Sequence, residues 1–420
     1  MRPNVRLIVF LFAFCFCLST AQVVIAQTPT PTPTPIQAGQ AIISELRLRG
    51  PGGPEDEFIE IYNNTNNPII VQSLDGTSGW SVVVSNGQIT GPVCTIPNAT
   101  NIPARGHFLC TNTNGYSLAG YPSGSPSNQI NALKADAIVA VSPFLLTTGD
   151  RTWDFDVPDG TGVALFATTN GTNFTAATRL DAFGFTTSPA LYREGNGFAI
   201  IPNANTEHTI YRDQRPSLTP KDTNDNAADF LFVQEVPNIQ TELLGAPGPE
   251  NLNSPTLMNT LGQTLLDPLL PASSFPNREK RTAIEANADL GSLYFRRTFT
   301  NNTGLPIKRL RFRVYDLTTR GTCPAPCADL RLLTSADEPI TVQGTPVTVE
   351  GVTLEAFPPS QVAGGGFNAS VSDNDITLGT PLNPTQSVRI QFKFGIMRNG
   401  NFRLGLNIEG QTSQPVINNF

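Results

Sequence analysis

Acidic side chains gather in one short stretch of the chain. Asp222, Asp225 and Asp229 fall within eight residues, and Asn224 and Asn226 lie between them. Calcium takes several oxygen ligands from one acidic loop, so this spacing predicts a calcium site formed by the three aspartates. The EF-hand spacing and its glycine are missing, and Asp and Asn also form turns by bonding their own backbone. Two interpretations therefore stay open, a calcium loop and an acidic turn, and no cofactor other than calcium is expected.

A second group of carboxylates could form a general acid/base pair. Glu45, Glu57 and Glu60 lie close together along two predicted strands. Carboxylates on neighbouring strands can share a proton or bind a cation. The other interpretation is a solvated face on which Arg47 or Arg49 pairs with them. The sequence contains no nucleophile elbow, Walker loop, HExxH motif or Rossmann fingerprint, so we expect the chain not to be an enzyme.

Arginines recur on two neighbouring stretches of the C-terminal half. Arg309, Arg311 and Arg313 alternate with apolar residues and so share one strand face, and Arg296 and Arg297 lie on the preceding predicted strand. Such a basic stripe could bind an anionic polysaccharide. It could equally be a basic edge that prevents strands of different molecules from pairing. A cell-surface polysaccharide or protein is the partner that we expect.

Cysteine usage favours disulfides. Two of the six cysteines lie within residues 1–27, and the other four form two close pairs, Cys94 with Cys110 and Cys323 with Cys327. An even count in an exported chain is typical of a disulfide framework. Neither pair has the spacing of a zinc ribbon or a neighbouring histidine. We therefore expect two disulfides, one within each pair.

The N-terminal residues have the composition of a secretory signal. Arg2 and Arg6 precede an apolar core at residues 7–18, and small residues suited to cleavage follow. We expect residues 1–27 to be a signal peptide and the protein to be secreted or at the cell surface, in an extracellular or periplasmic compartment. Residues 28–39, rich in Thr and Pro, are expected to be a semi-rigid linker.

The overall charge excludes some partners. Charged residues make up only 15% of the chain and the net charge is −7, which argues against nucleic acid as a partner. No apolar run after the signal reaches the roughly 18 residues of a membrane helix, so we expect no transmembrane segment in the mature chain.

The elements that must position these residues are strands. Residues 41–49 alternate between apolar and polar residues with the period of a half-buried strand. The Gly/Pro-rich residues 50–54 end that run, and residues 57–62 return to extended structure. Abundant Gly and Pro and many further short β-branched runs favour an all-β fold.

The order of residues in the first half resembles the lamin-tail domain family. Ile43-x-Glu45-Leu46 is followed by Asp-Glu-Phe-Ile-Glu-Ile-Tyr-Asn at residues 56–63, and then by Trp80. The Asp/Asn-rich turn ending in Asp-Phe at residues 222–230 and a Pro-Gly exit are similar to the close of that family. The resemblance covers roughly residues 38–254. It implies an immunoglobulin-like β-sandwich, and the family occurs in exported bacterial proteins.

The remainder of the chain predicts a second module. We expect the lamin-tail-like domain, with insertions, at residues 40–253, a linker at residues 254–277 and a second β-sandwich at residues 278–420. The second module is only generically similar to the immunoglobulin-like modules of bacterial surface proteins. The expected function is that of a secreted, non-enzymatic extracellular binding or structural protein. The alternative is an accessory module, or a degenerate relative, of an exported hydrolase.

Overall fold

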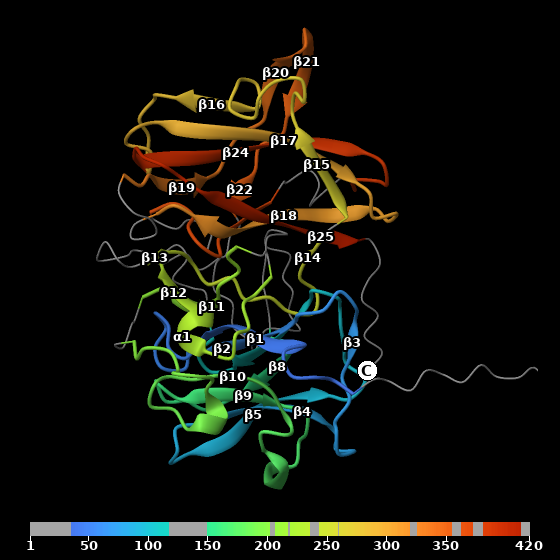
Figure 1. Cartoon of the computed structure of the whole chain (residues 1–420), viewed down its shortest axis with the longest axis vertical. Coiled ribbons are helices and arrows are strands. Elements are labelled where there is room, and N and C mark those ends of the chain that lie inside the picture. Colours follow the sequence, from blue (N-terminus) through green and yellow to red (C-terminus); the bar gives the residue numbers. More distant parts are fainter. Residues whose placement is uncertain are drawn as a thin grey trace, which may run out of the picture. The chain divides into compact units, whose positions relative to one another are not determined.

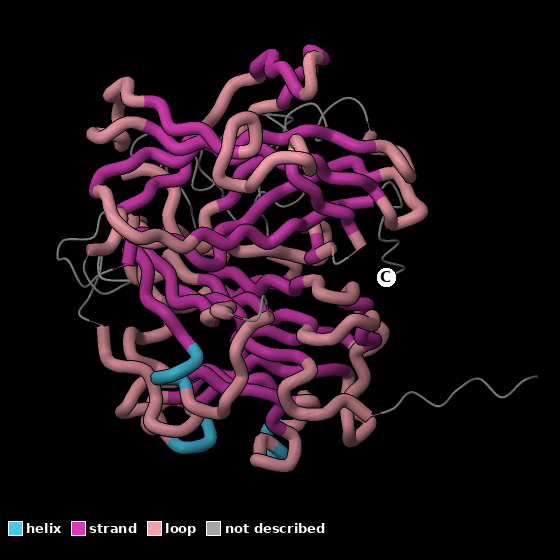
Figure 2. The backbone as a smooth tube through the Cα atoms, turned by 45° about the horizontal axis from the view of Figure 1, so that its top comes forward, coloured by secondary structure: helices cyan, strands magenta, loops and turns pink. Residues whose placement is uncertain are grey.

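The computed structural model describes residues 35–116, 149–201, 206–216, 219–235, 243–258, 260–319, 326–354, 363–372 and 381–412. The described residues from Ile36 onward belong to one compact unit. Strands dominate, and helix in the described ranges is limited to α1 (Asn226–Asp229) and short 3-10 turns (Figure 2). The expected all-β sandwich fold is confirmed. The expected signal peptide at residues 1–27 lies outside the described residues.

Two sheets form the sandwich of the first half, here called the N-terminal sandwich (Figure 1). The seven-stranded sheet has the order β13-β12-β11-β1-β2-β7-β8, and the four-stranded sheet has the order β10-β9-β4-β5. The bounds of the first sheet are β1 (Ala41–Arg47), β2 (Phe58–Asn63), β7 (His107–Asn112), β8 (Arg151–Trp153), β11 (His208–Arg212), β12 (Phe230–Gln234) and β13 (Leu243–Leu244). Those of the second are β4 (Gly79–Ser85), β5 (Thr90–Pro97), β9 (Gly162–Phe166) and β10 (Arg179–Phe183), and a separate pair joins β3 (Ile69–Ile70) to β6 (Asn101–Ile102).

The core of the N-terminal sandwich comes from the apolar faces of both sheets. Ile43 and Ile61 of the larger sheet and Val82 and Leu165 of the smaller one are fully buried in one cluster. Trp80 lies in the same cluster, and its indole N–H donates to the carbonyl of Gln72 at 2.9 Å. The alternation read from the sequence, which puts Ile42 on the face of Leu46, is wrong at this point: a β-bulge between Ile43 and Glu45 shifts the pattern, so Ile43 joins Leu46 in the core cluster.

The disulfide Cys94–Cys110 is confirmed. Cys94 lies in β5 and Cys110 in β7, so the bond ties the four-stranded sheet to the seven-stranded one. Both cysteines are buried. In the second expected pair, Cys323 lies outside the described residues, and the bond to Cys327 stays a prediction.

A second sandwich, here called the C-terminal sandwich, is also built from two sheets (Figure 1). One has the order β14-β25-β18-β23-β22, and the other has the order β15-β17-β24-β19 with β16 added to β17. The bounds of the first are β14 (Thr256–Leu257), β18 (Ile307–Leu317), β22 (Thr353–Leu354), β23 (Ser370–Ser372) and β25 (Leu404–Thr412). Those of the second are β15 (Leu261–Leu265), β16 (Arg278–Arg281), β17 (Ser292–Asn301), β19 (Asp329–Leu333) and β24 (Ser387–Arg398), and β20 (Glu338–Val342) and β21 (Thr345–Val349) form a hairpin.

Part of the stretch expected to be a linker is strand. Within residues 254–277, β14 pairs with β25 and β15 pairs with β17. These residues therefore contribute a strand to each sheet of the C-terminal sandwich. The expected domain boundaries stay a prediction. Within the described ranges, no helix has the length and apolar character needed to cross a membrane.

Candidate functional site

The first candidate site brings Glu45 and Glu60 together. They face each other across β1 and β2, in direct register. Each is only 3% exposed, and Glu57 is fully buried, so the solvated face considered from the sequence is wrong for all three. The polar side of this hairpin is covered by other parts of the chain, which a two-residue period by itself does not reveal.

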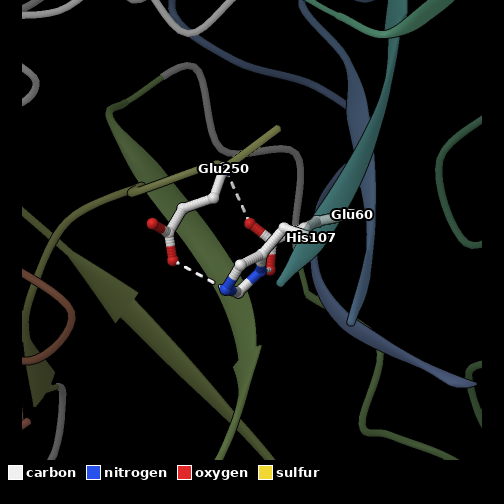
Figure 3. A group of neighbouring side chains, drawn as sticks. All are labelled: Glu60, His107 and Glu250. Atoms are coloured by element: carbon white, nitrogen blue, oxygen red, sulfur yellow. Dashed lines mark hydrogen bonds and ion pairs between the residues drawn. The ribbon is translucent and has the colours of Figure 1, made fainter. Parts of the chain in front are cut away.

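His107, at the start of β7, lies between two carboxylates (Figure 3). Its Nδ1 is 3.0 Å from Oε1 of Glu60, and its Nε2 is 3.0 Å from Oε2 of Glu250. The backbone N–H of Glu250 also donates to Oε2 of Glu60 at 2.6 Å. Glu250 precedes β14 and thus reaches the outer side of the seven-stranded sheet from the start of the C-terminal sandwich.

Two arginines of β18 complete the cluster. Arg311 contacts Glu250 and donates from its Nε to Oε2 of Glu409, in β25, at 2.6 Å. Arg313 lies 3.0 Å from the other oxygen of Glu250 and 3.3 Å from Oε1 of Glu409. All these side chains are buried or nearly so. We call the set the buried ion network, and its members are Glu45, Glu60, His107, Glu250, Arg311, Arg313 and Glu409.

Electrostatics assign charges to the network. Burial alone would lower the pKa of His107, but the carboxylates of Glu250 and Glu60 more than offset it and raise the pKa to about 10. Burial would raise the pKa of Glu250, yet Arg311 and Arg313 hold it well below its usual value. His107 is therefore an imidazolium at neutral pH, and Glu250 is a carboxylate shared by three cations.

The pKa of Glu45 is shifted in the opposite direction to that of Glu250. Burial, reinforced by the charge of Glu60, raises the pKa of Glu45 to about 7. Its Oε1 accepts a hydrogen bond from the backbone N–H of Gly248 at 2.9 Å. Glu45 therefore titrates near neutral pH beside Glu60, and proton sharing between the two carboxyl groups stays a prediction.

The space at this cluster is small. The network lines a cavity of about 30 Å³, which has room for a water molecule and not for a substrate. Glu60, His107 and Glu250 do present oxygen and nitrogen atoms within 4.8 Å of one another, as a metal site would. A metal would require a neutral imidazole and would compete with two guanidinium groups for Glu250. The arrangement is that of an ion network that joins β-sheets.

Of the arginine stripe read from the sequence, Arg309 and Arg297 are partly exposed, but the other three arginines do not lie on the surface. Arg311 and Arg313 are 4% and 5% exposed, because the network covers them. Their strand β18 lies between β25 and β23, so it is not a sheet edge either. Arg296, in β17, is fully buried and pairs with Glu279 and Glu338. Neither a polysaccharide-binding stripe nor a basic edge describes these residues.

The predicted calcium ligands separate into different contacts. Asp225 caps α1 by accepting a hydrogen bond from the backbone N–H of Ala227, and Asp229 accepts a hydrogen bond from the hydroxyl of Thr223 at 2.7 Å. Asp222 instead lies near Asp181 and Glu194, whose oxygens fall within 4.8 Å of one of its own. The turn interpretation therefore describes Asp225 and Asp229 well, and calcium binding at Asp222, Asp225 and Asp229 stays a prediction.

Arg212 is the centre of this acidic group. It donates to both oxygens of Asp181, at 2.7 and 2.6 Å, and lies 3.6 Å from both Asp222 and Asp229. Glu194 is 3.9 Å away. A buried guanidinium thus already neutralises part of the charge that a cation would meet. Asp181 and Glu194 were missed in the sequence because no spacing links them to the turn.

Replacement of Asp225 by alanine should separate the two interpretations of the turn. We expect a loss of about 1 kcal/mol of unfolding free energy, the usual cost of a removed helix cap, whether or not calcium is present. Thermal melts of the wild type and the variant, each in chelator and in millimolar calcium, measure it. A loss seen only in calcium would instead support a cation bound at Asp225.

Comparison with known proteins adds no further constraint. No protein-family model, no curated protein and no solved structure matches this chain.

Proposed function

We propose that this chain is an exported, non-enzymatic protein that binds or structures extracellular material, with its two β-sandwiches joined by the buried ion network. The observation that carries the proposal is that the clustered ionisable groups form ion pairs with one another. His107 and Glu250, which could otherwise act as base and acid, each contact two or more charged partners. A catalytic pair needs a free proton acceptor within reach of a substrate, and this cluster offers a cavity of about 30 Å³.

Two features support export. The composition of residues 1–27 is that of a signal peptide. The buried bond between Cys94 and Cys110 is of a kind that persists in oxidising compartments and is rare in the cytosol. Both features support the proposed location outside the cytosol, at the cell surface, in the periplasm or in the medium.

The likeness to lamin-tail domains is part of the proposal. The pairing of β1 with β2 and the burial of Trp80 in the sandwich core agree with the residue order on which the likeness rests. The proposed fold of the N-terminal sandwich is thus immunoglobulin-like. The proposed partner is a cell-surface polysaccharide or protein. The alternative function is that of an accessory module, or a degenerate relative, of an exported hydrolase.

A paired binding and turnover screen tests this function. The purified chain lacking residues 1–27 is incubated with glycans and cell-wall fragments, and both retention on the immobilised material and release of reducing ends or peptides are measured. We expect retention on at least one material and no turnover. Turnover by the wild type would overturn the non-enzymatic assignment, and its loss in Glu60→Gln and Glu250→Gln variants that circular dichroism shows to be folded would assign it to this cluster.

A further inference from the structure

The C-terminal sandwich encloses a much larger space than the ion network does. A cavity of about 450 Å³ lies between its two sheets, a volume within the range of small-molecule binding sites. Aromatic and aliphatic side chains from both sheets line it, among them Phe295, Phe299, Phe312, Phe392, Leu404 and Leu406. The strands that contribute them are β17 and β24 on one side and β18 and β25 on the other (Figure 1). The lining is that of a site for an apolar ligand.

Strand β25 has the opposite burial to that of an ordinary sheet strand. Its polar residues Asn407 and Glu409 are each 5% exposed, whereas Leu404, Leu406 and Ile408 on its other face are only partly buried and line the cavity. Glu409 belongs to the ion network, and the side-chain amide of Asn407 donates to Gln214, so both residues of the polar face have partners in the interior. The described residues leave the apolar face incompletely covered, as expected of a surface that meets an apolar ligand.

An arginine occupies an inward-facing position among these apolar residues. Arg297 alternates with Phe295 and Phe299 on β17, and it pairs in register with Ile390 of β24, which belongs to the core. It therefore lies on the face of the sheet that lines the cavity, and it is one of the lining residues. Its neighbour Arg296 lies on the opposite face, where carboxylates surround it.

No carboxylate in the described part of the chain pairs with Arg297. Its Nη1 donates to the carbonyl of Arg296 at 2.8 Å and, more weakly, to that of Asn277 at 3.4 Å, and these are its hydrogen bonds within the described residues. Burial lowers the pKa of Arg297, and no negative neighbour among the described residues offsets this effect. A half-buried guanidinium with free N–H groups is complemented best by an anionic group that accepts hydrogen bonds.

Part of the cavity lining, on the edge strand next to the strand of Arg297, is exposed to solvent. Strand β15 is the edge of its sheet and pairs with β17. Gln263, in that edge strand, lines the cavity and is exposed to solvent. A ligand could therefore place its polar end near solvent and Arg297, and its apolar part deeper between the sheets.

We propose that this cavity binds a single-chain anionic amphiphile of the fatty-acid class, with its carboxylate on Arg297 and its alkyl chain between the two sheets. The inference does not depend on the ion network that carries the proposed function. The fatty-acid class is the ligand proposed for the C-terminal sandwich, and it is separate from the partner proposed for the whole protein.

The experiment compares three ligands that share one chain and differ in the head group. Decanoate, 1-decanol and decyltrimethylammonium, each below its aggregation concentration, are titrated calorimetrically into the chain lacking residues 1–27. We expect decanoate to bind most tightly and the ammonium least. Arg297→Gln should weaken decanoate about tenfold or more, as expected for loss of a charged hydrogen bond, and should leave decanol unchanged. Arg297→Lys, which keeps the charge, should retain part of the preference.

Two further variants complete the test. Arg389→Gln removes an exposed arginine of β24 from the opposite face of the same sheet and should change none of the affinities. Leu406→Trp should fill the cavity and weaken decanoate and decanol alike, while circular dichroism reports whether the variant folds. Absence of decanoate binding to the wild type would overturn the proposal. So would equal affinities for the three ligands, or equal effects of Arg297→Gln and Arg389→Gln.

Discussion

Replacement of Glu250 by glutamine is expected to destabilise the protein by about 3–5 kcal/mol, the cost of removing one partner from a buried ion pair. Arg311 and Arg313 would stay buried, with Glu409 as the remaining carboxylate of the network for both. His107 would lose the partner of its Nε2. A buried charge left without a partner cannot regain the hydration that it gave up on folding, and this makes the expected effect large.

Urea unfolding measures this loss. Both tryptophans of the chain, Trp80 and Trp153, lie in the N-terminal sandwich, so their fluorescence reports that sandwich, whereas far-ultraviolet circular dichroism reports all strands. We expect the two signals to change together in the wild type and to separate in Glu250→Gln, because the network joins the two sandwiches.

Arg403→Gln is the matched control. Arg403 is half exposed and pairs with Asp316 at 3.0 Å, and an exposed pair of this kind contributes at most about 1 kcal/mol. If Glu250→Gln shifted the unfolding midpoint no more than Arg403→Gln, the network would not be a major source of stability. The double variant Glu250→Gln, Arg311→Met tests the coupling of the two residues. Its loss of unfolding free energy should be smaller than the sum of the losses in the two single variants.

Alkaline pH is expected to destabilise the folded chain well before its lysines titrate. The pKa of His107 is 6.5 when unperturbed and about 10 in the folded chain, so its stabilising contribution is complete below pH 6.5 and is lost as the pH rises to about 10. Burial raises the folded pKa of several carboxyl groups into the same region, to about 9 for Glu57 and Glu194, about 8 for Glu207 and about 7 for Asp150. The folded chain then binds more protons than the unfolded one, and stability falls as pH rises.

The measurement is the unfolding free energy as a function of pH. Each proton bound in excess by the folded state contributes a slope of up to about 1.4 kcal/mol per pH unit. Between pH 6.5 and 10, the unfolding free energy of His107→Gln should fall less steeply with pH than that of the wild type. The expected difference in slope is the contribution of about one proton.

The other histidine supplies the control for this prediction. Burial, with Arg47 nearby, lowers the pKa of His208 to about 4, so this side chain is neutral in both states above pH 6.5. His208→Gln should leave the slope unchanged in the alkaline region. An unchanged slope in His107→Gln would show that His107 is not charged in the folded protein.

Local pattern was enough to predict the class of fold and one covalent bond. The two-residue period of residues 41–49 and the Gly/Pro break after it predicted strands that the structure contains as β1 and β2. The proximity of Cys94 and Cys110, in a chain that the sequence predicts to be exported, predicted their disulfide. These features depend on neighbouring residues and on turn chemistry, which the chain specifies locally.

Only the tertiary structure decided which polar faces meet water. Alternation separates the two faces of a strand, but a polar face is equally compatible with solvent and with a complementary charged face from another sheet. The sequence pattern was therefore compatible with solvent exposure of Glu45 and Arg311, whereas the structure buries both in one network. In the same way Arg296 and Arg297 are adjacent in the chain and lie on opposite faces of β17. Long-range pairing, which brings Glu250 to His107 and aligns Arg297 with the core, determines their chemistry, and no local spacing encodes it.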